Sequence, residues 1–285
     1  MIESRHSRTP ENNSNKFKKN DKMKRAIIVI AAFVIPLIGL GQTKKFEYTP
    51  KVKNKVEIKN LLGEIALQNS SGNAIVIESD FAMEVPDRAA GLKLLGAMED
   101  NTELGVNVSE ENGVVSIQGA VKQVREHKYK ISVPTGMAVN LDYNSPFSKE
   151  QLVIDSFKGS LEIRTLNSDV KITNSTGPFA VNTISGDVEI VFSTVNQEAP
   201  TSIATISGLI DVTIPSGEKA NFGISSMQGN VYNNLDLKSK KEPEPDKRID
   251  GLAAIKREAG EFTLNGGGQK VYLKSISGNI YLRKR

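Results

Sequence analysis

The chain has 285 residues, of which 37 are Lys or Arg and 33 are Asp or Glu, so its formal net charge is +4. Cysteine is absent, which excludes a disulfide scaffold, thiolate metal sites, a cysteine nucleophile and a lipid-modified N-terminal cysteine. Two histidines are too few for a multi-histidine metal site within one chain. The length suits one large domain or two of ordinary size.

Residues 1–41 have the pattern of a leader. A basic segment ends at Arg25, and the run that follows, from Ala26 to Leu40, carries no charge. This apolar run is shorter than the ~20 residues that span a membrane. It is followed by small residues, as at the cleavage site of a secretory signal peptide. We expect cleavage between Gly41 and Gln42, with an uncleaved anchor as the alternative.

The leader carries the positive charge of the chain. It holds eight basic and three acidic residues, so residues 42–285 have 29 basic and 30 acidic residues and a net charge of −1. No basic excess remains for nucleic acid, and aromatic residues are not interleaved with Lys or Arg. We expect no nucleic-acid partner and no membrane span after signal removal. Because Met23 begins a complete signal sequence, it is the expected true start.

A short repeat follows in the second half of the chain. Turn-forming residues recur every nine positions at Gly159, Ser168, Gly177 and Gly186. Each is followed by alternating apolar residues, as in Leu161 and Ile163. Such alternation indicates a short strand with one buried face. Gly, Ser, Asn and Asp between the strands are turn residues.

A longer period overlies the short one. The pattern Thr/Ser-apolar-x-Gly/Ser begins at Thr165, Thr183, Thr205, Ser226 and Ser275. The first intervals correspond to two of the short units each, lengthened in places by loop insertions. The pattern adds Gly208, Gly229 and Gly278 to the expected repeat turn positions. Similar Gly-led strands recur from Gly63, Gly72 and Gly113, so one architecture is expected over 42–285.

These periods predict an all-β protein, a parallel β-helix or β-solenoid with coils of about 18–22 residues. A single strand–turn–strand unit cannot bury its apolar face, whereas coils stacked ~4.8 Å apart form continuous apolar columns. The alternative is a meandering antiparallel sandwich, which also has short, regularly spaced strands. The unbroken nine-residue interval favours the solenoid.

Two segments depart from the strand pattern. Residues 86–98 place apolar side chains at 89, 92, 95 and 98 behind Pro86, which predicts one short flanking helix that covers the first coils. Residues 238–250 are charged and rich in proline, which predicts an inserted loop.

The last residues carry a family resemblance. The run Asn265-Gly266-Gly267-Gly268, followed by Ser277-Gly278-Asn279-Ile280, resembles the closing motif of the exported "putative adhesin" β-strand-repeat family, related to auto-transporter adhesins with a head GIN domain. Ile184 to Val188 and Tyr129 to Gly136 are similar to its internal strands. The resemblance covers about residues 46–285 and implies a parallel β-helix in the bacterial envelope. It brings no catalytic residues.

The sequence offers little support for a catalytic site or a metal site. A Ser-His-Asp site would depend on His127, which stands in a charged stretch and is expected to be a solvated strand-edge residue. Asp169 and Asp187 precede strands, but the matching positions elsewhere are not carboxylates. Turn capping therefore explains the two aspartates better than a calcium ladder does. We expect no cofactor, no metal and no catalytic residue.

The expected function is that of a non-enzymatic exported protein with an extended binding surface. Its location would be the periplasm or cell surface of a Gram-negative bacterium, and its partner an envelope protein or a glycan. Outward Tyr232 and Tyr281 are candidates for that surface. The alternative is a β-helix that binds or cleaves polysaccharide, but the equivalent carboxylates Glu162 and Glu189 are expected on opposite faces.

Overall fold

The computed structural model describes residues 43–81, 87–89, 92, 98–120, 127–144, 150–240 and 258–285. The predicted leader, the alternative start at Met23 and the predicted cleavage site between Gly41 and Gln42 lie outside these residues. Signal cleavage therefore stays a prediction from the sequence.

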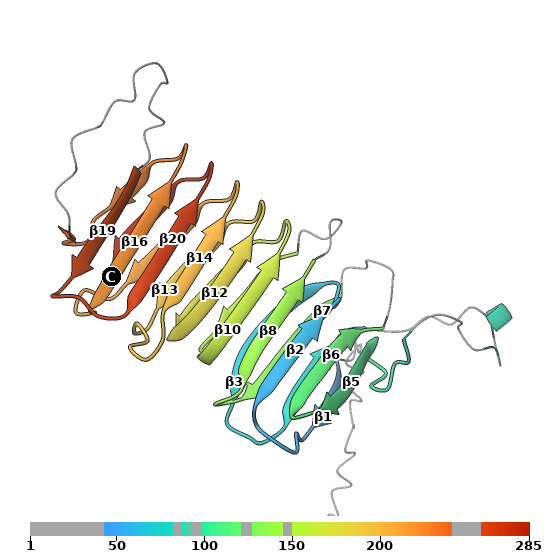
Figure 1. Cartoon of the computed structure of the whole chain (residues 1–285). Helices are drawn as coiled ribbons and strands as arrows, with labels where there is room; N and C mark the ends of the chain where they lie inside the picture. The colour runs from blue at the N-terminus through green and yellow to red at the C-terminus, as the bar shows by residue number, and fades with distance from the viewer. Residues whose placement is uncertain are drawn as a thin grey trace, which may run out of the picture. The chain divides into compact units, whose positions relative to one another are not determined.

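The described residues form two large, mostly parallel sheets, which confirms the all-β class (Figure 1). Sheet A has the spatial order β1 (Lys44–Tyr48), β4 (Ile75–Ser79), β7 (Lys128–Pro134), β3 (Glu64–Ser70), β9 (Leu152–Asp155), β11 (Val170–Ser175), β13 (Val188–Phe192), β15 (Ile210–Ile214), β21 (Ile280–Lys284) and β17 (Val231–Asn233). Sheet B has the order β18 (Lys238–Ser239), β19 (Glu258–Leu264), β16 (Ala220–Ser226), β20 (Lys270–Ser275), β14 (Thr201–Thr205), β12 (Gly177–Thr183), β10 (Lys158–Thr165), β8 (Ala138–Tyr143), β2 (Lys55–Lys59), β6 (Val114–Gly119) and β5 (Val106–Glu111).

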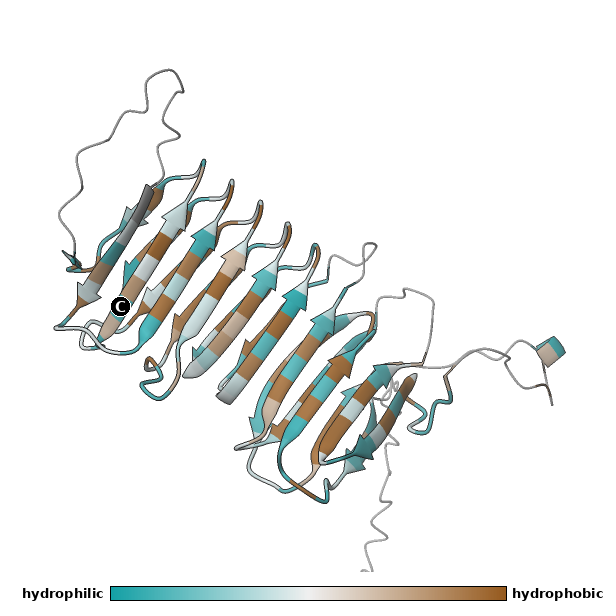
Figure 2. Ribbon diagram, in the orientation of Figure 1, coloured by the Kyte–Doolittle hydropathy of each residue, from teal (hydrophilic) through white to brown (hydrophobic). Residues whose placement is uncertain are grey.

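The core lies between the two sheets. Along most strands, buried apolar residues alternate with outward polar ones, which Figure 2 shows as bands of brown and teal. Equivalent residues of successive strands line up, so that Val170, Val188 and Ile210 form one buried column. Aromatic rings also contribute to this core, as where the centroids of the Phe179 and Phe192 rings lie 5.4 Å apart. The buried columns provide the main stabilisation, because burial removes apolar surface from water.

In the middle of the sheets, the stacking order follows the chain. Leu161 of β10 pairs in register with Phe179 of β12, and Val181 of β12 pairs with Ile203 of β14. In each pair the partner lies one coil further along the chain. Sheet A repeats these offsets between β11, β13 and β15. Each turn of the chain thus adds one strand to each sheet.

At both ends the stacking order departs from the chain order. Strand β20 lies between β14 and β16, and β21 lies between β15 and β17. Likewise, β2 lies between β6 and β8, and β3 between β7 and β9. Figure 1 shows the red strand β20 among orange neighbours and the blue strand β2 between green ones. The first and last coils of the chain are therefore interior coils of the stack.

The two irregular segments are described only in part. Within the predicted helix 86–98, Asp87–Ala89 form a single 3-10 turn, η1, while Leu92 and Met98 lie outside any helix. The remaining positions of that prediction lie outside the described residues, as do 241–250 of the predicted Pro-rich insertion. Of the insertion, the structure describes the short strand β18 and the residue after it.

Candidate functional site

The predicted turn positions fall into two groups at different corners of the coil. Gly159 and Gly177 lie where the chain enters strands of sheet B, and both have positive φ values, +145° and +84°, that favour glycine. Ser168, Gly186, Gly208, Gly278 and Gly229 lie where the chain leaves sheet B for sheet A. The nine-residue interval therefore alternates between two kinds of corner.

The second group forms a glycine column of close backbone contacts. A Cβ atom at Gly186 would overlap the carbonyl oxygen of Ser168 in the adjacent coil, and one at Gly208 would overlap that of Gly186. The same relation continues from Gly208 to Gly278 and from Gly278 to Gly229. Glycine is required at these four positions because the backbone of the adjacent coil leaves no space for a Cβ atom, whereas Ser168 begins the column.

The hydroxyl of the Thr/Ser-apolar-x-Gly motif fixes the corners at Gly186, Gly208 and Gly278. The Oγ1 atom of Thr183 accepts the backbone N–H of Gly186 at 3.0 Å, and that of Thr205 accepts Gly208 N–H at 2.9 Å. Ser275 does the same for Gly278 at 2.8 Å. Because these groups are buried, the side chain satisfies a donor that has no backbone partner in the turn. The motif is therefore a structural device.

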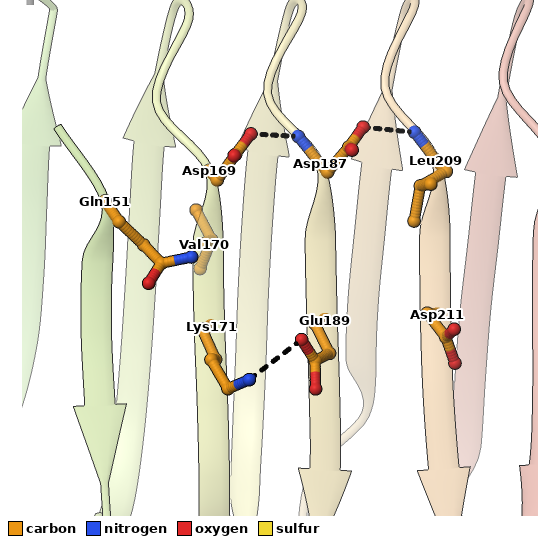
Figure 3. Close-up of a pocket in the computed structure, with 8 residues that line it drawn as sticks. All are labelled: Gln151, Asp169, Val170, Lys171, Asp187, Glu189, Leu209 and Asp211. Atoms are coloured by element: carbon orange, nitrogen blue, oxygen red, sulfur yellow. Dashed lines mark hydrogen bonds and ion pairs between the residues drawn. The ribbon is translucent and has the colours of Figure 1, made fainter. Parts of the chain in front are cut away.

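Next to these corners, a row of side chains that accept backbone N–H groups runs along sheet A. Two of them, Asp169 and Asp187, lie at the upper edge of a shallow groove, which Figure 3 shows. The Oδ1 atom of Asp169 accepts the backbone N–H of Asp187 at 2.9 Å. Asp187 in turn accepts the N–H of Leu209 at 2.9 Å. Further along, Asn279 accepts the N–H of Asn230 at 2.9 Å. These side chains cap the next coil, as predicted from their residue types.

The floor of this shallow groove holds charged residues in register. Lys171, Glu189 and Asp211 occupy equivalent positions of β11, β13 and β15. Lys171 Nζ lies 3.1 Å from Glu189 Oε2, while the guanidinium of Arg283 donates to both carboxylate oxygens of Asp211 at 2.8–2.9 Å. The side chains are thus held by one another, which gives the outer face of sheet A a defined polar surface.

Asp155 of β9 lies in the next outward row, in register with Thr173 of β11, and its side chain is also held by its neighbours. Its carboxylate accepts hydrogen bonds from Thr173 Oγ1 at 2.6 Å, from Ser156 Oγ at 2.8 Å and from Asn174 Nδ2 at 2.9 Å. These hydrogen bonds, with that of Thr173 the largest, lower the pKa of Asp155 below its usual value, because they stabilise the charged form.

The predicted outward tyrosines come together at the end of the row that contains Lys171, Glu189 and Asp211. Tyr232 of β17 pairs in register with Tyr281 of β21, and their rings stack at 5.2 Å with an interplanar angle of 10°. Arg283 lies 5.4 Å from the centroid of Tyr281. Tyr232 remains half exposed, at 50%. The groove and the tyrosine pair form one surface on sheet A, which we call the sheet A face.

The residues considered for catalysis lie apart. Glu162 is on sheet B and Glu189 on sheet A, as expected from their spacing. The prediction of a solvated His127 is wrong: its side chain is only 18% exposed and packs edge-on against Phe81 at 4.8 Å. The charged residues that precede His127 in the sequence gave no sign of Phe81, which covers it from a distant segment.

The described residues contain no group of three or more acidic or histidine side chains placed to hold a metal ion. They also contain no helix long and apolar enough to cross a membrane. Sequence reasoning missed one surface feature, the outward residues Lys270, Tyr272 and Lys274 of β20. Their strict alternation along the strand is the signal that could have identified them.

Parallel coils with a glycine column and a capped groove define a repeat protein of the β-solenoid type. Comparison with family models gives a match to Toastrack DUF4097 over residues 48–282. The chain belongs to this family, and the resemblance found in its sequence is confirmed.

Solved structures of low sequence identity are also similar to the chain. A "putative cell adhesion protein" from Clostridium sporogenes is 8% identical, with a TM-score of 0.42 over 86% of this chain and 100% of the other. A "putative adhesin" from Bacteroides fragilis is 12% identical, with a TM-score of 0.35 over 85% and 97%. A "putative lipid binding protein" from Parabacteroides distasonis is 13% identical, with a TM-score of 0.29 over 87% and 98%. No curated protein matches the sequence.

Proposed function

We propose that this protein is a non-enzymatic, exported component of the bacterial envelope that binds a partner through the sheet A face. The observation that carries the proposal is that the polar side chains of this face are already fixed. Lys171, Glu189, Asp211 and Arg283 hold one another in ion pairs, and Asp169 and Asp187 accept backbone N–H groups. A preorganised surface loses little side-chain entropy when it binds a partner.

Export is supported by the predicted leader, and we propose the periplasm or the cell surface of a Gram-negative bacterium as the location. The net charge of −1 that remains after cleavage gives no reason to expect a nucleic-acid partner. The expected partner is an envelope protein or a glycan. Fractionation of the native host, followed by N-terminal sequencing, tests this location: a mature chain that begins upstream of Ala26 would contradict cleavage.

Cross-linking in the intact envelope tests the binding surface. A photo-reactive residue at Thr213 of β15 lies on the sheet A face, and one at Ser116 of β6, on the outer face of sheet B and six strands away from β20, is the matched control. We expect a discrete cross-linked product from position 213 and a weaker one from position 116. Equal products from both positions, or none from position 213, would refute the assignment of the sheet A face.

A polysaccharide-cleaving protein is the second candidate, because Glu189 and Asp211 lie in register on adjacent strands. Glycoside hydrolases usually use a pair of Asp or Glu side chains as their catalytic residues. Here, however, each carboxylate is bound to a cation of its own, Lys171 or Arg283. Release of reducing ends or unsaturated products from a panel of acidic and neutral glycans would establish the enzyme and reject the binding protein.

A further inference from the structure

Sheet B carries an aromatic and basic stripe that the sheet A face does not include. Along β20, Lys270, Tyr272 and Lys274 point outward, while Val271, Leu273 and Ser275 are buried. Tyr272 is 42% exposed and is among the few large apolar side chains that reach the surface. Since β20 belongs to the last coil of the chain and lies between β14 and β16, both flanks of this stripe are formed by strands from earlier coils.

The neighbouring strands leave the ring of Tyr272 uncovered. In register with it stand Ser202 of β14 and Gly223 of β16. A Cβ atom at Gly223 would come within 2.8 Å of the ring, so the edge of Tyr272 occupies the space of the missing side chain. Ala204 and Ser225 flank Lys274 in the same way. Small residues on both sides let a flat ligand approach the ring closely.

The contrast with the other exposed tyrosines is informative. Tyr232 and Tyr281 cover a face of each other by stacking at 5.2 Å. Tyr272 has no aromatic neighbour among the described residues: one edge of its ring packs over Gly223, and the ammonium of Lys270 lies 5.8 Å from the ring centroid. The ring of Tyr272 therefore offers an open apolar surface with a polar hydroxyl, which suits amphipathic ligands.

The charges of the two lysines are not neutralised by an ion pair with any described residue. Lys171, Lys128 and Lys55 each lie within 3.3 Å of a carboxylate oxygen. Lys270 and Lys274, in contrast, form no ion pair within the described part of the chain. Glu261 of β19 is the nearest acidic residue in the row of Tyr272, and it is separated from Tyr272 by Gly223 of β16. Unpaired ammonium groups on either side of an exposed ring attract an anionic ligand.

From this arrangement we infer that the stripe Lys270–Tyr272–Lys274 is a binding site for an acidic glycan. The C–H face of a pyranose ring would pack against Tyr272, and its carboxylate or sulfate groups would pair with the two ammonium groups. The two lysines stand four positions apart on one strand, about 13 Å at strand geometry. A ligand that contacts both must therefore be an oligomer with repeated negative charges.

A glycan fits these observations better than an acidic protein does. Strand β20 is hydrogen-bonded on both sides, so a peptide cannot be added to it as a further strand. The residues that flank Tyr272 in register, Ser202 and Gly223, are too small to wall a pocket for a peptide side chain. A protein partner is therefore tested as the competing outcome.

Titration calorimetry of the purified protein with oligogalacturonate tests the inference. Two matched probes separate the contributions. Neutral maltoheptaose offers sugar rings without charge, and poly-L-glutamate offers negative charge without sugar rings. We expect binding of oligogalacturonate that weakens with added salt, and at least tenfold weaker or undetectable binding of the other two. Tyr272→Ala and the double variant Lys270→Gln/Lys274→Gln should each weaken oligogalacturonate binding at least tenfold. Val52→Ala, which truncates an exposed apolar side chain outside both the stripe and the sheet A face, is the control and should leave binding unchanged.

Three results would overturn the inference: no binding of oligogalacturonate, equal binding of poly-L-glutamate, or unchanged binding by Tyr272→Ala. Should that variant fail to fold, an NMR titration of the unsubstituted protein, isotope-labelled at its six tyrosine rings, provides the same test. The signal of Tyr272 must shift on titration more than those of Tyr232 and Tyr281. The result is independent of the proposed function, because cross-linking at position 213 reports only on the sheet A face.

Discussion

The middle of this protein and its two ends are built from the same kind of coil but are assembled differently. Between β9 and β15, each coil pairs with the coil that precedes it in the chain. At the ends, β2 and β3 are enclosed by coils that come later in the sequence, and β20 and β21 by coils that come earlier. A repeat sequence therefore specifies how a coil packs without specifying which coil becomes its neighbour.

Core truncation in the two regions should produce the largest effects and test this difference most directly. Ile190 of β13 and Ile280 of β21 are both fully buried. Replacing either with Ala should lower the free energy of unfolding by about 2–5 kcal/mol, because a cavity remains. Chemical denaturation of the two variants measures this loss.

The folding kinetics of the same two variants should differ. Ile190 pairs with Ile172 and Val212, which belong to the coils directly before and after it in the chain. Ile280 pairs with Ile210 and Val231, which are far from it in the sequence. Contacts between distant segments form late. Ile190→Ala should therefore slow folding, and Ile280→Ala should mainly speed unfolding. If both changes fall on the same arm of a stopped-flow chevron plot, the end coils do not close last.

A second comparison uses the glycine column, which passes through both regions. Gly186→Ala in the middle and Gly278→Ala in the inserted coil would each place a methyl group against a backbone carbonyl of the adjacent coil. Each should cost about 1–3 kcal/mol of stability, since the backbones must separate. Gly217→Ala is the matched control, because its Cβ would meet no atom within 4 Å. A much smaller loss for Gly278→Ala would mean that the inserted coil packs more loosely.

The side-chain caps along sheet A allow a finer comparison. Asp187→Ala removes the acceptor for the N–H of Leu209, and Asn279→Ala removes the acceptor for the N–H of Asn230. A single partly exposed hydrogen bond contributes about 1 kcal/mol, so each variant should lose about that amount. Amide hydrogen exchange at Leu209 and Asn230 should accelerate in the respective variant. Unchanged exchange would show that the caps contribute nothing to local stability.

The smallest predicted effect concerns pH and the N-terminal inserted coil. Glu57 of β2 is hydrogen-bonded by Lys55 at 2.8 Å and by Lys59 at 2.5 Å, and these bonds lower its pKa to about 2. A carboxylate with a lowered pKa in the folded state stabilises the protein above its unfolded pKa of about 4.3. That contribution is lost as the pH falls toward 2.

Glu57→Gln should therefore reduce stability slightly at pH 7 and flatten the loss of stability between about pH 4.3 and pH 2. Thermal melts of the variant and the unchanged protein across this range measure the difference. Parallel curves for the two proteins would show that Glu57 titrates with its ordinary pKa.

Much of the local structure could be predicted from the sequence. The nine-residue interval identified the strands around Leu161 and Val188, because buried faces and turn glycines both leave a regular pattern. The longer period predicts turns at Gly208 and Gly278, and the alternation along the strands predicts that Tyr232 and Tyr281 point outward, but neither pattern indicates that the two rings stack. These features depend on neighbours within one or two coils.

The stacking order and the exposed stripe could not be predicted in this way. The motif that ends in Gly278 is nearly the same as the one that ends in Gly208, so nothing local distinguishes a coil added at the end from one inserted between two others. The environment of Tyr272 depends on Gly223, which belongs to an earlier coil beyond the charged insertion. Likewise, the covering of His127 depends on Phe81, which no periodic pattern connects to it.

The edges of the two sheets have a consequence for aggregation. Among the described strands, three of the four at the sheet edges, β1, β5 and β18, are antiparallel to the strand beside them, although the interior strands are mostly parallel. Two of them are also charged, with the sequence KKFEY in β1 and two glutamates at the end of β5. An open parallel edge would accept the next coil of another molecule and allow fibres to grow. Reversed and charged edge strands disfavour such growth, which lets a protein built from repeating coils end its own stack.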